Sequence, residues 1–215
     1  MPVLTEAETV AFLASIEQVR AASAQKLLNT RDAAQAVGFV QNMHRSIDLA
    51  AARASARGPA PACKAGCAFC CSVRVEATEP EVFLIARQLR EWPEARRSAV
   101  IGRMRTRVAT QSVRPDGTRQ DCAFLEDRQC SIYASRPGVC RKAHSLSVAH
   151  CESRAAQIPQ VVSLLAEAEA LMTGVAQAYR QADLPISQLE LQAAVLAALD
   201  DEAAEQDWYR LWTTP

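Results

Sequence analysis

The sequence has no excess charge of either sign and few aromatic residues. Lysine and arginine together number 24, as do aspartate and glutamate, so the formal net charge is zero. This balance provides no general attraction to nucleic acid or to an anionic membrane, and we expect neither as a partner. Aromatic residues make up only 5% of the chain. A core must therefore be built from Leu, Val, Ile and the many alanines.

Signals for export and for membrane insertion are also missing. The first six residues contain neither a basic region nor an apolar region of the kind that signal peptides carry. No stretch approaches the roughly 18 consecutive apolar residues of a transmembrane helix. We therefore expect a cytoplasmic protein. Because thiols are kept reduced in the cytosol, clustered cysteines there are expected to bind metal rather than to form disulfides.

Helix signals run through most of the chain. Three Ser/Thr–Glu pairs stand three residues apart, as in capping boxes that begin helices: Thr5–Glu8, Thr78–Glu81 and Ser187–Glu190. Apolar residues at helical spacing follow the first pair as the stripe Val10, Leu13 and Ile16. Similar stripes predict long helices from Arg31 to Arg57 and from Val161 to Tyr179. Residues 114–117 are expected to form a turn.

These patterns predict a mainly α fold, a helical domain with a loop-rich cysteine insert organised by metal. Residues 1–215 are expected to form a single helical domain. Within it, residues 59–151 would be the cysteine-cluster metal-binding core. N-terminal helices in residues 1–58 and C-terminal helices in residues 155–215 would flank this core.

Eight cysteines lie between Cys63 and Cys151, and the rest of the chain has none. Four of them form a C-x3-C-x2-C-C block: Cys63, Cys67, Cys70 and Cys71. The other four are widely spaced: Cys122, Cys130, Cys140 and Cys151. Thiolates are soft ligands that suit zinc and iron–sulfur clusters. We therefore predict that all eight are metal ligands and that both groups meet at one centre, with Cys151 contributing least.

The number and spacing of the cysteines leave several arrangements open. Eight suffice for two four-thiolate sites, or for one site and a redox pair. The adjacent Cys70 and Cys71 point in different directions from one backbone, which suits two neighbouring metals, or one ligand and one spare thiol, and favours a polynuclear site. Either His144 or His150 would be able to complete a site. His44 lies on a helix stripe and is expected to be structural.

The order of these motifs resembles the bacterial YkgJ-type cysteine-cluster family, which is described as zinc- or iron-chelating. The resemblance spans roughly Pro61 to Cys151 and rests on the first cysteine block followed by Cys122-Ala123-Phe124-Leu125, Cys130-Ser131-Ile132-Tyr133, Arg136-Pro137 and Cys140-Arg141. It implies that the seven cysteines up to Cys140 are ligands, with Cys151 a looser match. A related cysteine block occurs in flagellin lysine methylases.

Physical roles can be expected for the other residues of the motif. Phe124 and Tyr133 would shield the site from water. Arg136 and Arg141 would offset the negative charge of several thiolates.

Three functions follow as hypotheses. The first is a metal-binding protein that holds an iron or iron–sulfur centre. The second is a zinc protein in which the metal staples the insert of an accessory module that binds a protein partner. The third is a protein-modification enzyme, methyltransferase-like, that uses the metal site. Whether the chain is an enzyme stays open, since it contains no Gly-rich nucleotide loop and no recognised catalytic motif.

Overall fold

The computed structural model describes residues 5–111 and 119–213, so the turn expected at residues 114–117 lies outside the described residues. Most described residues are helical, which confirms the predicted mainly α fold. The elements in chain order are α1 (Glu6–Leu27), α2 (Ala33–Arg57), the 3-10 helix η1 (Phe69–Ser72), β1 (Glu76–Ala77), α3 (Glu79–Arg90), α4 (Glu94–Gln111), β2 (Leu125–Glu126), β3 (Gln129–Cys130), α5 (Gly138–Lys142), α6 (Val148–Glu152), α7 (Val162–Gln181), β4 (Leu189–Glu190), α8 (Leu191–Asp200) and α9 (Ala204–Thr213).

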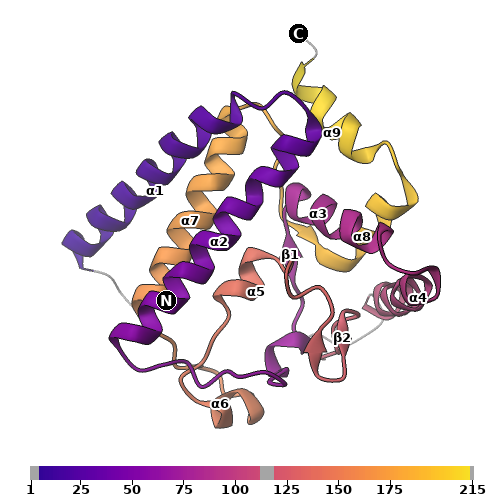
Figure 1. The fold of residues 1–215 in the computed structure, drawn as a ribbon. Helices are drawn as coiled ribbons and strands as arrows, with labels where there is room; N and C mark the ends of the chain where they lie inside the picture. The colour runs from indigo at the N-terminus through magenta and orange to yellow at the C-terminus, as the bar shows by residue number, and fades with distance from the viewer. Residues whose placement is uncertain (1–4, 112–118, 214–215) are drawn as a thin grey trace.

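Three long helices, α1, α2 and α7, lie side by side and form one layer (Figure 1). Helix α7 packs against both others. Its Gly174 lets α1 approach closely, because a Cβ atom there would lie only 2.7 Å from the backbone oxygen of Ile16 and from the Val19 side chain. On the other side, the buried Tyr179 hydroxyl donates a 2.7 Å hydrogen bond to the Ala36 carbonyl of α2.

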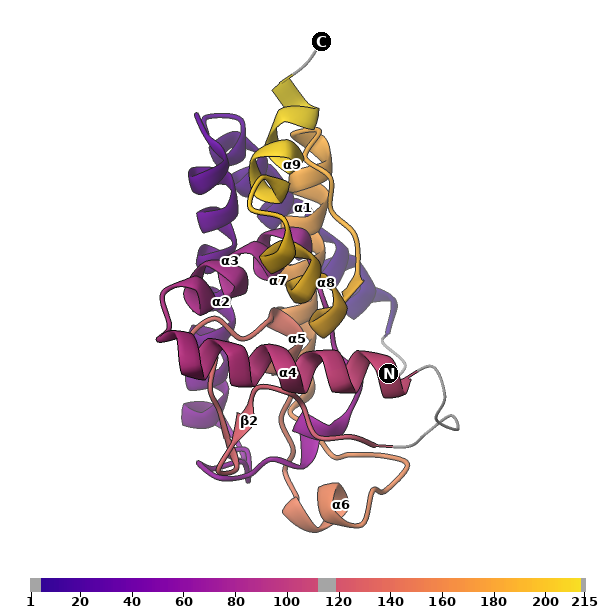
Figure 2. The same cartoon turned by 90° about the vertical axis from the view of Figure 1, so that its right-hand side faces the viewer.

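A second layer contains α3, α4, α8 and α9 (Figures 1 and 2). Helix α8 packs against α3 and α4, and the short antiparallel pair β1–β4 joins the segments that precede α3 and α8. Trp208 of α9 packs against Phe83 and Tyr179, with ring centroids 5.6 and 6.3 Å apart. The described aromatic residues near the C-terminus therefore belong to the core.

Two local expectations were wrong. Val10 and Leu13 of the α1 stripe are 63% and 57% exposed, because α1 extends beyond the surface that α7 covers, and only Ile16 is buried. The Ser187–Glu190 capping box does not form. Strand β4 includes Glu190, which caps α8 itself by accepting a 2.8 Å hydrogen bond from Ala193, while the Ser187 N–H donates to Glu79.

The cysteine-bearing segments gather at one end of the molecule, away from the C-terminus (Figures 1 and 2). They are the loop after α2 with η1, the β2–β3 hairpin, α5 and the loop with α6. Among the described residues, no helix is both long enough and apolar enough to cross a membrane.

Candidate metal centre

The first cysteine block is a turn followed by a 3-10 helix. The Cys67 N–H donates a 2.9 Å hydrogen bond to the Lys64 carbonyl, and Gly66 within this turn has a φ of 81° that favours glycine. The chain then enters η1, which carries Cys70 and Cys71. Neither a continuous helix nor a purely irregular loop describes the block.

The second group of cysteines is attached directly to η1. The Cys122 N–H donates a 2.7 Å hydrogen bond to the carbonyl of Cys71, and the Gln120 N–H donates to Ser72 at 3.2 Å. The two cysteine groups, distant in sequence, are therefore adjacent in the fold. Their contact is a short backbone ladder, which fixes where the second segment starts.

Arg107 of α4 reinforces this contact, and the sequence did not single it out. Its side chain is buried, and its guanidinium donates to the carbonyls of Gln120, Asp121 and Val73. One cation thus satisfies carbonyls from both sides of the junction. In the sequence Arg107 is one of many arginines in a predicted helix, and nothing there distinguishes it as a buried residue.

Cys122, Cys130 and Cys140 follow in a tightly hydrogen-bonded region. The Leu125 N–H donates to the Cys122 carbonyl at 2.9 Å, and Leu125 pairs with Cys130 in the β2–β3 hairpin. Both Cys122 and Cys130 pack against the hydrophobic core. Cys140 lies in α5, which packs against α2 and α7. These three cysteines are therefore held by the body of the fold.

Cys63 and Cys151 are supported differently. The Ala62 N–H donates a 2.8 Å hydrogen bond to the Ser145 carbonyl, and the Cys63 sulfur lies 4.0 Å from that same oxygen. Cys151 lies in the five-residue helix α6, which packs against η1. The loop that carries α6 thus brings Cys151 to the first cysteine block.

The electrostatics of Cys63 show which thiols are its neighbours. Burial raises the pKa of the Cys63 thiol, a backbone hydrogen bond at Ser145 lowers it, and the thiols of Cys67, Cys70 and Cys151 raise it further. Since like charges repel mainly at short range, the fold brings Cys67, Cys70 and Cys151 near Cys63.

Cys140 has other thiols near it, although Cys70 is near both Cys63 and Cys140. Burial raises the pKa of Cys140 to about 12, and the thiols of Cys122, Cys130 and Cys70 add to the increase. Burial likewise raises the pKa of Cys122 and of Cys130. Thiols of this kind stay protonated until a metal displaces the proton, so binding should release protons.

The vicinal thiols interact with each other and with the second cysteine group. A hydrogen bond between the side chains of Cys70 and Cys71 raises the pKa of Cys70 and lowers that of Cys71. The thiols of Cys122, Cys130 and Cys140 oppose the lowering at Cys71, after its burial. Cys70 in turn raises the pKa of Cys130 and of Cys140, so both vicinal thiols lie near the second group.

The two arginines of the motif have different roles. The positive charge of Arg136 lowers the pKa of Cys130 and Cys140, against the larger effect of burial, and its guanidinium stacks 3.8 Å from the Tyr133 ring centroid. Its buried Nε has no hydrogen-bond partner among the described residues. Arg136 is thus the principal cation beside the thiols.

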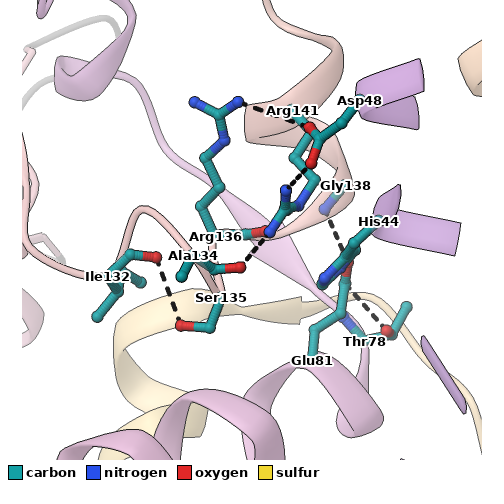
Figure 3. A network of polar contacts seen from close by, with 10 residues as sticks. All are labelled: His44, Asp48, Thr78, Glu81, Ile132, Ala134, Ser135, Arg136, Gly138 and Arg141. Carbon is teal, nitrogen blue, oxygen red and sulfur yellow. Dashed lines mark hydrogen bonds and ion pairs between the residues drawn. The ribbon is translucent and has the colours of Figure 1, made fainter. Parts of the chain in front are cut away.

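Arg141 mainly anchors the loop. Its guanidinium binds Asp48 Oδ2 of α2 at 2.6 Å, the Arg136 carbonyl at 2.9 Å and the Ala134 carbonyl (Figure 3). Of the two aromatic residues expected to shield the site from water, Phe124 is buried whereas Tyr133 is 61% exposed.

The two histidines of the cysteine segment differ in whether their ring nitrogens already have hydrogen-bond partners. His144 uses both ring nitrogens: Nδ1 lies 2.7 Å from the Lys142 carbonyl, and Nε2 accepts a 2.8 Å hydrogen bond from the Val161 N–H. As it stands, His144 has no nitrogen to offer a metal. His150 is exposed, and its Nδ1 lies 2.8 Å from the Ser147 hydroxyl.

His44 is structural, as expected, and pairs with a buried carboxylate. Its Nε2 lies 3.0 Å from Glu81 Oε1, which also accepts a 2.7 Å hydrogen bond from the Gly138 N–H (Figure 3). The second oxygen of Glu81 completes the capping box with the N–H and hydroxyl of Thr78, each at 2.9 Å. One carboxylate therefore joins α2, α3 and the start of α5.

The donors present fit a thiophilic metal in type and in number, because eight reduced cysteines lie on segments that gather at one end of the molecule, with the Arg136 cation beside Cys130 and Cys140. As the side chains stand, no three His, Cys, Asp or Glu residues within 5–111 and 119–213 form a group that could hold a metal ion.

Comparison with known families bears on this segment. Residues 62–161 match the CxxCxxCC family model, described as "Putative zinc- or iron-chelating domain". The match includes all eight cysteines and confirms the resemblance seen in the sequence. Residues 62–161 are therefore similar to that family, and the match covers slightly less than half of the chain. No curated protein and no solved structure matches the chain.

Proposed function

We propose that this protein holds an iron or iron–sulfur centre through its clustered cysteine thiolates, in the cytoplasm. The observation that carries the proposal is that segments with cysteines of both groups meet at η1, because the Cys122 N–H binds the Cys71 carbonyl and α6, which carries Cys151, packs against η1. The ligands would be Cys63, Cys67, Cys70, Cys71, Cys122, Cys130, Cys140 and Cys151. Residues 59–151 would then be the metal-binding core of a single helical domain.

The number and placement of the thiols support iron over a single zinc ion. One structural zinc takes four ligands in a tetrahedron at about 2.3 Å, which would leave half of the thiols unused. Iron–sulfur clusters also take four cysteines but extend over several metal atoms. The adjacent thiols of Cys70 and Cys71, which point in different directions from one backbone, would suit a polynuclear arrangement.

The surroundings support a thiolate-bound centre. Arg136 supplies positive charge beside Cys130 and Cys140, which would offset part of the negative charge that ligated thiolates retain. When bound, an iron–sulfur centre would supply one-electron redox chemistry. The protein's own residues would hold it at the end of the helical layers, where Cys63 and Cys70 are exposed.

A zinc-stapled accessory module is the second candidate. It is favoured by the irregular backbone of the segment, in which short helices and hairpins are linked by single hydrogen bonds. The exposed Tyr133, stacked on Arg136, would suit contact with a protein partner. The methyltransferase-like alternative receives no support, because the family description names chelation and no reaction.

The deciding experiment is purification without oxygen, followed by metal and sulfide analysis. We expect brown protein with absorbance near about 400 nm, iron, and acid-labile sulfide. The matched variant Cys140→Ser should lose colour, whereas Ser131→Ala, in the same segment but without a thiol, should keep it. Colourless protein with stoichiometric zinc would establish the second candidate instead, and protein without any metal would refute both.

A further inference from the structure

The turn between β2 and β3 has an unusual backbone for its sequence. Glu126 pairs with Gln129, so Asp127 and Arg128 form a two-residue hairpin loop. Their φ angles are 48° and 61°, both in the left-handed region. Hairpin loops with positive φ at both positions usually place glycine second, because glycine adopts this backbone without strain. Arginine at that position adds strain, which persists only where other contacts offset it.

The side chain of Arg128 contacts the first cysteine block. Its Nε–H donates a 3.0 Å hydrogen bond to the Gly66 carbonyl, 62 residues away in the sequence, and its guanidinium lies 6.0 Å from the Phe69 ring centroid. The Gly66 carbonyl belongs to the peptide bond that leads into Cys67. The N–H of the same peptide bond donates a 2.9 Å hydrogen bond to the Lys64 carbonyl. Both polar groups of this peptide bond are therefore held.

The first cysteine block needs such support, because the core does not hold it. No residue from 58 to 76 is buried. The start of the hairpin is anchored, since Phe124 is buried and Arg103 of α4 donates to the Ala123 carbonyl at 2.9 Å and to Glu126 at 2.6 Å. Arg128 therefore ties a segment with little packing of its own to one that the core and α4 fix in place.

From these contacts we infer that Arg128 is a positioning residue for the metal centre. Its guanidinium holds the turn at Cys67 before a metal binds, so that the metal has less of the block to order. The inference rests on the proposed function, because Cys67 is one of the ligands proposed there. Apparent affinity decreases with the fraction of molecules whose binding groups are already in place. Loss of the contact should therefore weaken metal binding.

Arg128→Gly is the sharpest variant, because glycine relieves the backbone strain while it removes the contact. The full chain, reduced and free of metal, would be labelled with deuterium on the millisecond timescale. We expect hydrogen exchange about three- to tenfold faster at residues 64–67, as for the loss of one hydrogen bond. Unchanged or slower exchange there would refute the positioning role.

The second measurement is the affinity for Zn²⁺ alone, obtained by competition with a chelator. Zinc is redox-silent and binds cysteine thiolates. We expect the dissociation constant to be about three- to tenfold higher in Arg128→Gly. Arg128→Lys should lie close to the natural protein, because its ammonium group can still donate to the Gly66 carbonyl. Faster exchange with unchanged zinc affinity would show that the contact does not serve the metal, and would overturn the inference.

Two controls use the same replacement by glycine. Arg154 also has a positive φ, 56°, and is exposed, and its side chain has no hydrogen bond or ion pair within the described part of the chain. Asp127→Gly changes the same hairpin loop but keeps Arg128. Arg154→Gly and Asp127→Gly should leave both measurements unchanged. A loss in either control as large as in Arg128→Gly would assign the effect to lost charge or to the glycine, against the inference.

The inference and the proposed function fail in different ways. If the natural chain binds zinc and Arg128→Gly behaves identically in both measurements, only the positioning role is refuted. If the natural chain binds neither zinc nor iron, the proposed function is refuted and the positioning role with it. Helix content by circular dichroism checks folding in every variant, because α1, α2 and α7 lie outside the cysteine segment.

Discussion

Replacing Glu81 by glutamine should destabilise the protein strongly although the side chain keeps its size. The Glu81 carboxylate is only 3% exposed and accepts from His44, from the Gly138 N–H and twice from Thr78. A glutamine oxygen can replace one carboxylate oxygen, and the Thr78 hydroxyl or, in its other tautomer, the His44 ring can accept from the new NH₂ group. The NH₂ group would still face the backbone N–H of Thr78 or of Gly138, so one charge-assisted hydrogen bond is lost whichever way the amide is turned.

The magnitude follows from that bond. A hydrogen bond to a charged group contributes about 1.5–3 kcal/mol, which is a large part of the roughly 5–15 kcal/mol that stabilises a typical domain. For a chain of this length each kcal/mol shifts the melting temperature by about 2–4 °C. We expect the Glu81→Gln variant to melt at a temperature roughly 3–12 °C lower.

The matched control is Glu8→Gln. Glu8 forms the same type of capping box with Thr5, with both hydrogen bonds at 2.8 Å, but it is exposed on α1 and joins no other element. Thermal unfolding of both variants, at equal metal content, should show a far smaller effect at Glu8. Equal effects at the two positions would mean that burial and the contacts to α2 and α5 contribute nothing.

The pH dependence provides a second check. Burial raises the pKa of Glu81, but the hydrogen bond and charge of His44, with the N–H groups of Thr78 and Gly138, outweigh it and hold the pKa below its ordinary value of 4.5. A group with a lowered folded pKa stabilises fully above its unfolded pKa, and this contribution disappears as the pH falls through the folded value. The difference between the natural protein and Glu81→Gln should therefore shrink in acid below about pH 4.5, and a difference that stays constant there would refute the reasoning.

Three further perturbations test other parts of the structure. Gly174→Ala should destabilise the protein by about 1–3 kcal/mol, because the new Cβ would clash with α1. Gly102→Ala, where a Cβ would have nothing within 4 Å, should instead stabilise α4 by about 0.4–1 kcal/mol. Chemical denaturation measures both free energies of unfolding, and equal effects would contradict the close approach of α1 and α7. Removing metal with a chelator should increase hydrogen exchange in residues 59–75 and 121–151 before it affects α1, α2 or α7, and unchanged protection would show that the segment is ordered without metal. His144→Gln should loosen the loop to Val161 without loss of metal, since both ring nitrogens already have backbone partners. The matched control is the same substitution at His150, the exposed histidine of α6. A metal ion lost from the His144 variant, as measured by metal analysis, would make His144 a ligand.

The capping boxes show how far sequence reasoning reached into this fold. Thr78–Glu81 was predicted from three-residue spacing and forms as predicted, because its partners are local. The same signal at Ser187–Glu190 was wrong, since pairing of β4 with β1 places Glu190 at the N-cap. Local hydrogen bonds can be read from spacing, whereas a competing strand contact between distant segments cannot.

The long-range partners of the site could not have been predicted in the same way. The C-x3-C-x2-C-C spacing indicated that the first thiols lie together, and the family match supports their role in chelation. It gave no sign that Cys71 turns toward Cys122 while Cys151 joins Cys63. Likewise, Arg107 carried no mark among the arginines of its helix, because its burial results from the loops that fold over α4.

The helical layers and the metal segment are coupled through a few buried polar groups. Glu81 of α3 accepts from the Gly138 N–H, two residues before Cys140, and Asp48 of α2 binds Arg141, one residue after it. Both contacts position α5 before any metal arrives, at residues that are not themselves ligands. Since an ordered ligand loses less conformational entropy on binding, these contacts would favour metal capture at Cys140. No comparable ion pair supports Cys151 among the described residues, and this asymmetry is the physical reason to expect the thiols near the core to bind a metal first.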